Sequence, residues 1–406
     1  MIASLLVLCA PLAPVSVTFT QEDPPEPTTL QEALVSGRTW LDLNYRVEHA
    51  SQDTLSKDAY ASTLRTALGY ETATFHGFRG LIEFEDISNL GNDIYNSTTN
   101  GTIDRPVVAD PDSTEVNQVY ATYAPNDSTE LRLGRQEIAY GNHRFIGTVA
   151  WRQNHQSFDA GRVDWTSGDG TTISYAYLDS VRRIFGEDSP KGAEKMASHL
   201  VDVRRKVEGL GDFAAYGYYL DFDRSERVSS LTLGARLAGE RDISEDLDLL
   251  YTVEYAKQED AAHNPINIDA DYWLAEIGAD FGVATVRLGN EHLGGSGNTG
   301  DKFSTPLATL HKFNGFADLF LVTPDTGIED RYLSVSGKIG QVKCAATYHV
   351  FQSDAGDINY GKEIDFTALY PLNDRTKIGA KLAHFMADDA YTDTDRAMAW
   401  INYRVL

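Results

Sequence analysis

Residues 38–49 (RTWLDLNYRVEH) alternate between apolar and polar side chains. In an extended chain Leu41, Leu43, Tyr45 and Val47 project from one face, and the polar residues between them project from the other. An alternation of about ten residues matches a tilted strand that crosses the hydrocarbon layer of a membrane. The stretch therefore predicts a transmembrane β-strand, with its apolar face toward lipid and its polar face toward the lumen of a barrel.

The same period of two returns along the chain. Every second residue is apolar across 216–222, 231–237, 249–255, 273–281, 342–350, 364–370 and 397–405. No long segment has the apolar spacing of an amphipathic helix. The sequence predicts an all-β fold, a transmembrane antiparallel β-barrel of about eighteen strands. We expect these strands at 38–48, 58–71, 77–88, 116–125, 128–140, 157–167, 170–180, 198–208, 212–224, 227–240, 246–259, 268–282, 283–293, 329–339, 341–352, 361–371, 375–387 and 395–405.

The connections between these strands sort by length. Short turns at 125–127, 167–170, 208–211 and 372–374 alternate with long connections at 89–115, 141–156, 181–197 and 294–328. Bacterial outer-membrane barrels have short periplasmic turns and long extracellular loops, whereas a soluble multi-sheet protein has no reason to sort its loops in this way. We therefore expect the protein in the cell outer membrane of a Gram-negative bacterium.

The chain divides into three predicted segments. Residues 1–20 contain a long apolar run and are expected to be a signal peptide, although no Lys or Arg precedes the run. Residues 21–36, which begin QEDPPEPTT, are polar and proline-rich and are expected to be a disordered lead-in. Residues 37–406 are expected to form the outer-membrane β-barrel domain, without a transmembrane helix.

Composition excludes several classes of function. The 406 residues carry a formal net charge of −25, which argues against nucleic acid as a partner because phosphate binding needs a basic surface. The 21 tyrosines suit strands and the membrane–water interface. Two cysteines, Cys9 and Cys344, provide no disulfide framework. We expect no metal and no cofactor, because the sequence contains neither a metal-ligand cluster nor a redox pair.

The polar faces of the predicted strands are rich in cations, which we expect to line the pore and contact the substrate: Arg38, Arg46, Arg65, Arg79, Arg132, Arg236, Arg287, Lys338, Lys343, Lys377, Lys381 and Arg404. The acidic residues on the same faces are Asp42, Glu48, Glu83, Glu85, Glu130 and Glu254. Charged side chains inside a wide barrel need water, so the pattern predicts a hydrated channel. Any single pair of opposite charges can instead serve only to stabilise the barrel wall. Because cations outnumber anions on this face of an acidic chain, we favour permeation of anions.

Two stretches resemble the alginate-export family of outer-membrane porins. The first comprises Leu133-Gly134-Arg135-Gln136, Tyr140-Gly141, Arg144, Ile146-Gly147, Trp151-Arg152-Gln153-Asn154 and Phe158-Asp159-Ala160, and the second is 305–318 (TPLATLHKFNGFAD). The positions that we single out in these motifs are Gly134, Arg135, Gln136, Trp151, Asp159, His311, Lys312 and Asp318. We expect His311 to order its loop by hydrogen bonding.

The resemblance implies an eighteen-stranded conduit, lined by basic residues, for a carboxylated polysaccharide. It also implies a long periplasmic loop late in the barrel that acts as a lid, but the connection at 372–376 is short. Phe316 and Leu319 stand where the family more often has Trp and a basic residue. We therefore expect a more open channel that passes alginate or related uronate poly- and oligosaccharides, or other small anions. A general diffusion porin without carbohydrate specificity is the alternative.

The expected partners are outer-membrane lipid and lipopolysaccharide and an anionic oligo- or polysaccharide, and the barrel is expected to be monomeric. An outer-membrane enzyme or adhesin is the rival class. The candidates for catalysis are His143, His155, Ser157 and Asp159, but histidines in loops are usually just solvated, so we expect no enzyme. Asp104, Asp110, Asp112 and Glu115 make the 89–115 loop acidic without the spacing of a calcium-binding loop. We expect that loop to fold inward and narrow the mouth of the channel.

Overall fold

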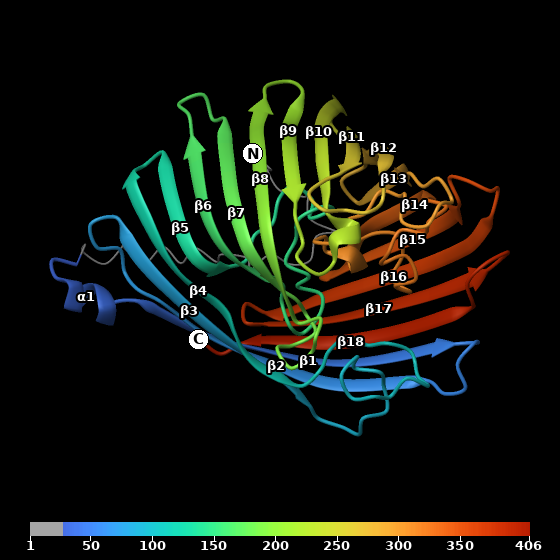
Figure 1. Ribbon diagram of the computed structural model, residues 1–406, viewed down its shortest axis with the longest axis horizontal. Coiled ribbons are helices and arrows are strands. Elements are labelled where there is room, and N and C mark those ends of the chain that lie inside the picture. The colour runs from blue at the N-terminus through green and yellow to red at the C-terminus, as the bar shows by residue number, and fades with distance from the viewer. Residues whose placement is uncertain (1–26) are drawn as a thin grey trace.

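The computed structural model describes residues 27–406, which form a closed antiparallel barrel of eighteen strands (Figure 1). The strands are β1 (Arg38–Gln52), β2 (Ala59–Glu71), β3 (Phe78–Asn89), β4 (Ser113–Asn126), β5 (Thr129–Gln136), β6 (Ser157–Thr166), β7 (Thr172–Arg182), β8 (Ala193–Val207), β9 (Gly211–Leu220), β10 (Ser230–Ser244), β11 (Leu247–Asp260), β12 (Asp269–Asp280), β13 (Ala284–Leu293), β14 (Ile328–Ile339), β15 (Val342–Gln352), β16 (Asn359–Asn373), β17 (Thr376–Ala387) and β18 (Thr394–Arg404). Each strand pairs with its sequence neighbours, and β1 also pairs with β18, so the sheet has no free edge. The predicted fold class is confirmed.

The burial of side chains in this barrel is the reverse of that in a soluble protein. On β1, Tyr45 and Val47 are 37% and 40% exposed, whereas Arg46 and Glu48 are 3% and 2% exposed. The same alternation of exposed apolar and enclosed polar residues runs along most of the other strands. A barrel in lipid must turn its apolar side chains outward and its polar side chains to the lumen. The alternation seen in residues 38–49 therefore has the predicted orientation.

The connections sort by length as predicted. At one end of the barrel lie the short turns 72–77, 127–128, 167–171, 208–210, 245–246, 281–283, 340–341 and 374–375. At the other end the connections reach 23, 20 and 34 residues at 90–112, 137–156 and 294–327. In outer-membrane barrels the short turns are periplasmic and the long loops extracellular.

One predicted apolar face points the other way. Tyr216, Tyr218 and Leu220 on β9, which we expected to face lipid, are 8% exposed or less and belong to the buried core inside the barrel. Tyr216 packs against Phe145 of the 137–156 loop, with the ring centroids 5.3 Å apart. Alternation gives the two faces of a strand but not their direction, and here a loop fills the barrel with apolar side chains.

The segment before the barrel is also more ordered than expected. Residues 30–35 (LQEALV) form the short helix α1 (Leu30–Val35), whose first turn is capped by the Thr29 side chain. Ala33 is buried, and its carbonyl accepts a hydrogen bond from Ala73 N (3.1 Å). The expectation of a disordered lead-in is therefore wrong for the part of 21–36 that is described. The predicted signal peptide, 1–20, lies outside the described residues. No helix in residues 27–406 is long and apolar enough to cross a membrane.

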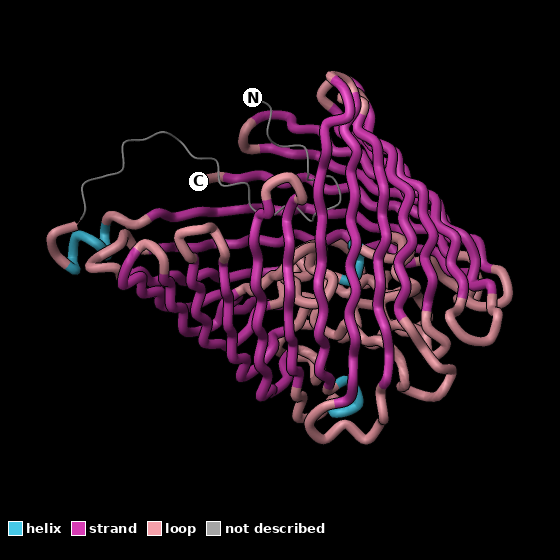
Figure 2. The backbone as a smooth tube through the Cα atoms, turned by 90° about the horizontal axis from the view of Figure 1, so that it is seen from above, coloured by secondary structure: helices cyan, strands magenta, loops and turns pink. Residues whose placement is uncertain are grey.

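The longest loops fold back into the barrel instead of standing out from it (Figure 2). Ile146, Phe303, Leu307 and Ala317 of the 137–156 and 294–327 loops are almost completely buried in the core cluster. Tyr95 and Val108 of the 90–112 loop pack in a second cluster with small residues of β1 and β2. The interior of the wall is thus partly covered by the chain itself.

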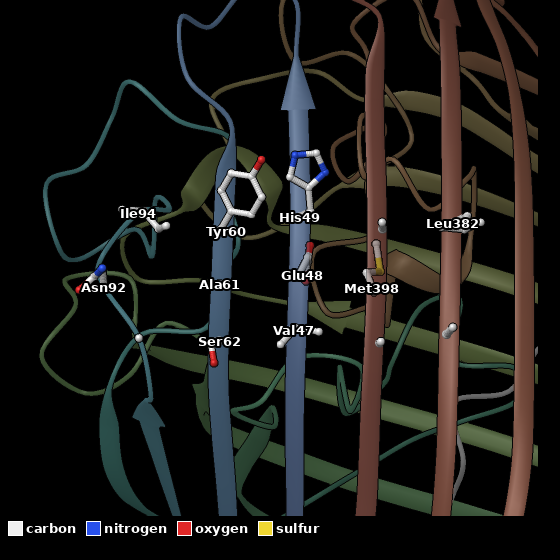
Figure 3. A pocket seen from close by; sticks show the side chains of 14 residues that line it. Val47, Glu48, His49, Tyr60, Ala61, Ser62, Asn92, Ile94, Leu382 and Met398 are labelled. Carbon is white, nitrogen blue, oxygen red and sulfur yellow. The ribbon is translucent and has the colours of Figure 1, made fainter.

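The outer wall carries a groove of about 590 Å³ across β17, β18, β1 and β2 (Figure 3). Val47, His49, Tyr60 and Leu382 project along it, and Ala380, Ala397 and Ala399 also line it. These residues alternate with inward-facing ones such as Arg46 and Glu48. The groove therefore opens toward lipid and is separate from the lumen.

The orientation of the strands predicts opposite outcomes at neighbouring positions on β14. Leu333 is exposed on the outer face, whereas the Ser334 hydroxyl points inward and accepts a hydrogen bond from Thr347 (3.1 Å). Leu333→Arg places a cation in hydrocarbon and should lower the free energy of unfolding by about 2–4 kcal/mol in the middle of the bilayer. Ser334→Arg should have a much smaller effect. Urea unfolding in lipid vesicles measures both, and equal losses would contradict the orientation.

Candidate functional site: the lumenal wall and the inner loops

Two loops far apart in sequence, 137–156 and 294–327, bind each other inside the barrel, and we call them the inner loops. Gly147 N donates to Leu307 O (2.9 Å), and Thr309 N donates to His143 O (3.0 Å). The Gln156 side-chain amide donates to both Gly147 O (2.8 Å) and Leu307 O (3.0 Å). Most of the residues that carry the resemblance to the alginate-export family therefore meet in one place.

Six charged residues hold the inner loops to the wall, and we call them the ion-pair network: Arg46, Glu48, Asp110, Arg152, Asp318 and Arg396. Arg152 lies at the centre, with Nη1 3.1 Å from Glu48 Oε2 and Nη2 2.8 Å from Asp318 Oδ2. Arg396 Nη1 lies 2.7 Å from Glu48 Oε1, and Arg46 Nη1 lies 3.3 Å from Asp110 Oδ2. No side chain in the network is more than 6% exposed.

The ion-pair network is balanced, because it contains three arginines and three carboxylates. Burial by itself lowers the pKa of Arg152, but Glu48, Asp110 and Asp318 together raise that pKa above its ordinary value. Burial raises the pKa of Asp318, and His311, Arg396 and Arg152 overcome this and lower it. The formal charges of the three arginines and three carboxylates cancel, so the network presents little net charge to the lumen.

A stack of three aromatic rings lies beside the network. The His311 ring is parallel to the rings of Trp151 (centroids 4.5 Å apart) and Phe316 (5.1 Å). Lys381 Nζ lies 3.9 Å from the Trp151 centroid and 3.8 Å from the Phe316 centroid, a cation–π arrangement. Phe316, where the family more often has Trp, thus keeps an aromatic face at this point.

His311 is neutral and joins the stack to the ion-pair network. Burial is the main cause that lowers its pKa to about 3, aided by Lys381 and opposed by Asp318. Its Nδ1–H donates to Asp318 Oδ1 (2.6 Å), and its Nε2 accepts from Lys381 Nζ (3.0 Å). The predicted hydrogen bonding by His311 is confirmed.

Carboxylates on the wall hold the backbone of the second motif. Glu363 Oε1 accepts from Ala317 N (2.7 Å), and Asp365 Oδ2 accepts from Phe316 N (3.1 Å). Gly315 has a φ of +86°, and a Cβ there would overlap the Glu363 carboxylate. The sequence NGFAD can therefore approach the wall only because its second residue is glycine.

The other motif positions have structural roles. Lys312 Nζ donates to Asn142 O (2.9 Å) and so links the inner loops, while the Gln136 amide donates to Ala160 O (3.1 Å). Gly134 has a φ of +129°, and a Cβ there would overlap the backbone of β4. Arg135 Nε lies 2.8 Å from Asp159 Oδ1. Arg135 and Asp159 adjoin the enclosed Gln136 and Phe158 and project from the outer side of the wall.

All twelve cations expected to line the pore project from the inward side of their strands. The eight arginines have carboxylate partners within 4 Å, for example Arg65 with Glu85, Arg132 with Glu130 (2.8 Å) and Arg404 with Asp42 (2.9 Å). Lys381 contacts His311. Contact of these residues with a substrate remains a prediction.

Three of the twelve cations differ from the others, and we call them the lysine patch: Lys338, Lys343 and Lys377. Within residues 27–406, no carboxylate lies within salt-bridge distance of their ammonium groups. They lie near the short-turn end of β14, β15 and β17, and Lys338 is the register partner of Lys343. The lysine patch therefore places three cations without carboxylate partners at that end of the described wall.

The residues considered for catalysis do not form a catalytic arrangement. His155 Nδ1 lies 2.8 Å from Glu137 Oε1, and Asp159 is engaged by Arg135 and Arg182. Within the described part of the chain, no hydrogen bond joins Ser157 to His143 or His155. The acidic loop residues also have protein partners, such as Lys57 for Asp104 and Arg46 for Asp110.

Sequence reasoning missed the roles of four residues of the site: Asp110, Glu363, Asp365 and Arg396. Arg396, Glu363 and Asp365 lie on inward faces that alternation had already identified, so their pattern was visible although their role was not. Asp110 lies in a loop, and nothing in the sequence pairs it with Arg46 and Arg152.

A closed antiparallel barrel with an apolar exterior, a charged interior and loops folded into its lumen is an outer-membrane porin. The sequence model of the family described as "Alginate export" matches residues 41–285, and the chain belongs to this family. The match includes the first motif stretch and ends before the second, 305–318. No curated protein sequence matches the chain.

Solved porins share the fold. OccAB4 of Acinetobacter baumannii superposes with a TM-score of 0.71 at 14% identity, covering 91% of this chain and 97% of that one. OccK9 (OpdG) of Pseudomonas aeruginosa gives a TM-score of 0.72 at 13% identity, covering 92% and 99%. OpdK of Pseudomonas aeruginosa, solved with vanillate, gives 0.69 at 14% identity, covering 91% and 98%. At this identity the likeness establishes the architecture.

The contact between Gly315 and Glu363 can be tested with a control in the same loop. Gly297 has a φ of +82°, close to that of Gly315, but a Cβ there would meet only Thr326 Cγ2 at 3.8 Å. Both Gly→Ala changes strain the backbone, and only Gly315→Ala also displaces the carboxylate that accepts from Ala317 N. Gly315→Ala should therefore weaken loop docking by about 1–3 kcal/mol more than Gly297→Ala. Hydrogen exchange of residues 311–318 measures this, and equal effects would refute it.

Acid should loosen the inner loops through His311. An undocked histidine titrates near 6.5, whereas the pKa of docked His311 is about 3. Between these values the undocked loop binds a proton that the docked loop does not, so docking weakens as the pH falls from about 6.5 toward 3. Protease cleavage within 294–327 should increase from pH 7 to pH 4, and less so in His311→Gln.

Two other histidines contribute to this pH dependence. Burial, with Lys312 and Arg204, lowers the pKa of His143 to about 4. Protonation of His143 at low pH therefore also weakens loop docking. Burial and Arg65 oppose the charged form of His155, but Glu85 and Glu137 prevail and raise its pKa, which acts in the opposite direction. The difference between wild type and His311→Gln isolates the His311 contribution, and an identical pH dependence of cleavage would contradict it.

Proposed function

We propose that this porin is a water-filled channel of the Gram-negative outer membrane that passes anionic carbohydrate, such as alginate or related uronate chains, or other small anions. The observation that carries the proposal is the lysine patch. Its three ammonium groups lie on the inward face without a carboxylate partner in residues 27–406. The lysine patch is therefore a site of unpaired positive charge on the inner wall of an acidic chain.

The arrangement of the lysine patch supports an anionic solute. Lys338 and Lys343 occupy directly opposed positions of β14 and β15. Like charges opposite each other on a sheet face destabilise it, and an anion passing between them removes that repulsion. Cations on a channel wall raise the local concentration of anions and bias permeation toward them. The family to which the chain belongs favours a carboxylated polysaccharide among such anions.

A general diffusion porin is the second candidate, and the paired arginines favour it. Eight of the twelve inward cations are neutralised by neighbouring carboxylates, which leaves few groups to select a solute. Transport without catalysis, a monomeric barrel, and contact of the outer wall with lipid and lipopolysaccharide complete the proposal.

Reversal potentials across a planar bilayer test the proposal. Wild type should prefer anions, strongly in dilute salt and weakly near 1 M, where the screening length is only about 3 Å. Replacing Lys343 and Lys377 together with Gln should move the reversal potential toward cation preference. Lys195→Gln, in the exposed ion pair with Asp179 on β7, is the control and should change little. Cation preference of the wild type in dilute salt would overturn the anion channel and favour a general porin.

A further inference from the structure

We propose that the inner wall near the short-turn end carries a binding subsite for single uronate rings, with the indole of Trp40 as its platform. The inference rests on the proposed function and deepens it. The lysine patch attracts any anion, whereas this subsite recognises a carboxylate that is attached to a hydroxylated ring. Three features of the wall around Trp40 support it.

The first feature is the way in which Trp40 lies on the wall. Trp40 on β1 is the register partner of Gly69 on β2, and a Cβ on Gly69 would overlap the six-membered and five-membered rings of the indole. The ring therefore lies flat across the neighbouring strand, with one face on its backbone. Trp40 Nε1 donates to Glu83 Oε2 on β3 (2.8 Å), which fixes the ring. The side chain is partly exposed on the lumenal side of the wall, and the Arg38 guanidinium lies over the ring, 5.8 Å from its centroid.

The second feature is a pair of exposed guanidinium groups on either side of the ring. Arg38 lies two residues before Trp40 on β1, and its side chain is 74% exposed. Arg404 lies on β18 opposite Asp42, two residues after Trp40, and its side chain is 41% exposed. Arg38 Cζ lies 5.8 Å from the centroid of the indole, so Arg38 can reach a carboxylate on a ring that rests there, and Arg404 on β18 is a second, more distant cation. Guanidinium groups bind carboxylates through two parallel hydrogen bonds.

The third feature is a set of carboxylates that can accept hydrogen bonds from hydroxyl groups. Glu71 pairs with Arg38 (2.8 Å), and Asp42 pairs with Arg404 (2.9 Å), so each arginine next to the platform has an acceptor beside it. A simple aromatic acid offers a flat ring and a carboxylate but no donors for these acceptors. A uronate ring offers an apolar face, a carboxylate and several hydroxyl groups. It is therefore the ligand that uses all three features.

A second tryptophan lies over a glycine of the neighbouring strand, farther from the short-turn end. Trp400 on β18 is the register partner of Gly379 on β17, and a Cβ on Gly379 would overlap its indole. Trp400 lies opposite Arg46 and packs edge-on against Trp151, with centroids 5.2 Å apart. The strip formed by β17, β18, β1 and β2 thus carries two tryptophans that lie over glycines, and Trp400 is contacted by an inner loop.

Blockade of single-channel current by added solutes tests the subsite. Trigalacturonate, added on the short-turn side in dilute salt, should block the current of the wild-type channel at a lower concentration than either the neutral sugar maltotriose or the aromatic anion benzoate. Trp40→Leu fills the space over Gly69 without a ring and should raise the dissociation constant for trigalacturonate about fivefold or more. Trp40→Phe should restore part of the affinity. Arg38→Gln should reduce the preference for trigalacturonate over maltotriose.

Tyr332 provides a matched control, because its ring lies over Gly289 in the same way on another part of the wall. Tyr332→Leu should leave trigalacturonate blockade unchanged. If trigalacturonate blocks Trp40→Leu at the same concentration as wild type, and the reversal potential of the variant still shows anion preference, the subsite is wrong and the proposed function stands. If benzoate blocks more tightly than trigalacturonate and depends on Trp40, the ligand class is wrong. Loss of anion preference in wild type would instead overturn the proposed function.

Discussion

The interior of this barrel depends on the buried ion pairs that Arg152 makes with Glu48 and Asp318. A charge removed from water is costly unless an opposite charge and hydrogen bonds compensate for it. Arg152 comes from one inner loop, Asp318 from the other, Glu48 from β1 and Asp110 from the 90–112 loop. One guanidinium group thus fixes three loops relative to the wall, and the stack around His311 is attached to the same network.

This arrangement separates the structural charges from those that remain for solutes. Hydrocarbon outside the barrel requires every backbone hydrogen bond to be made within the closed sheet, and it sends the polar side chains inward. Most inward arginines are then neutralised by carboxylates, in the network or along the wall. The lysine patch, which has no carboxylate partner in residues 27–406, is left near the short-turn end. In the described part of the chain, the channel thus has paired charges in its middle and three unpaired lysines near its short-turn end.

The sequence predicted the strands of the barrel wall well, but it did not predict how the inner loops pack inside the barrel. Alternation, as in residues 38–49, follows from the two solvents on either side of a strand, so it located all eighteen strands within a few residues except at the start of β8, where the strand begins earlier. It could not give the direction of the apolar face at Tyr216 and Tyr218, because a loop inside the barrel is also an apolar environment. The two family-like stretches were recognisable, but their contact through Gln156 and Arg152 depends on the way in which the loops fold back.

A double-mutant cycle between Arg152 and Asp318 tests the central claim, that buried ion pairs hold the inner loops in the lumen. Arg152→Met, Asp318→Leu and the double variant are compared by hydrogen exchange of residues 137–156. We predict a coupling energy of about 1–3 kcal/mol, because each single change leaves buried charges uncompensated and the double change relieves part of that cost. Additive effects, within about 0.5 kcal/mol, would show that the two residues act independently and would contradict the account.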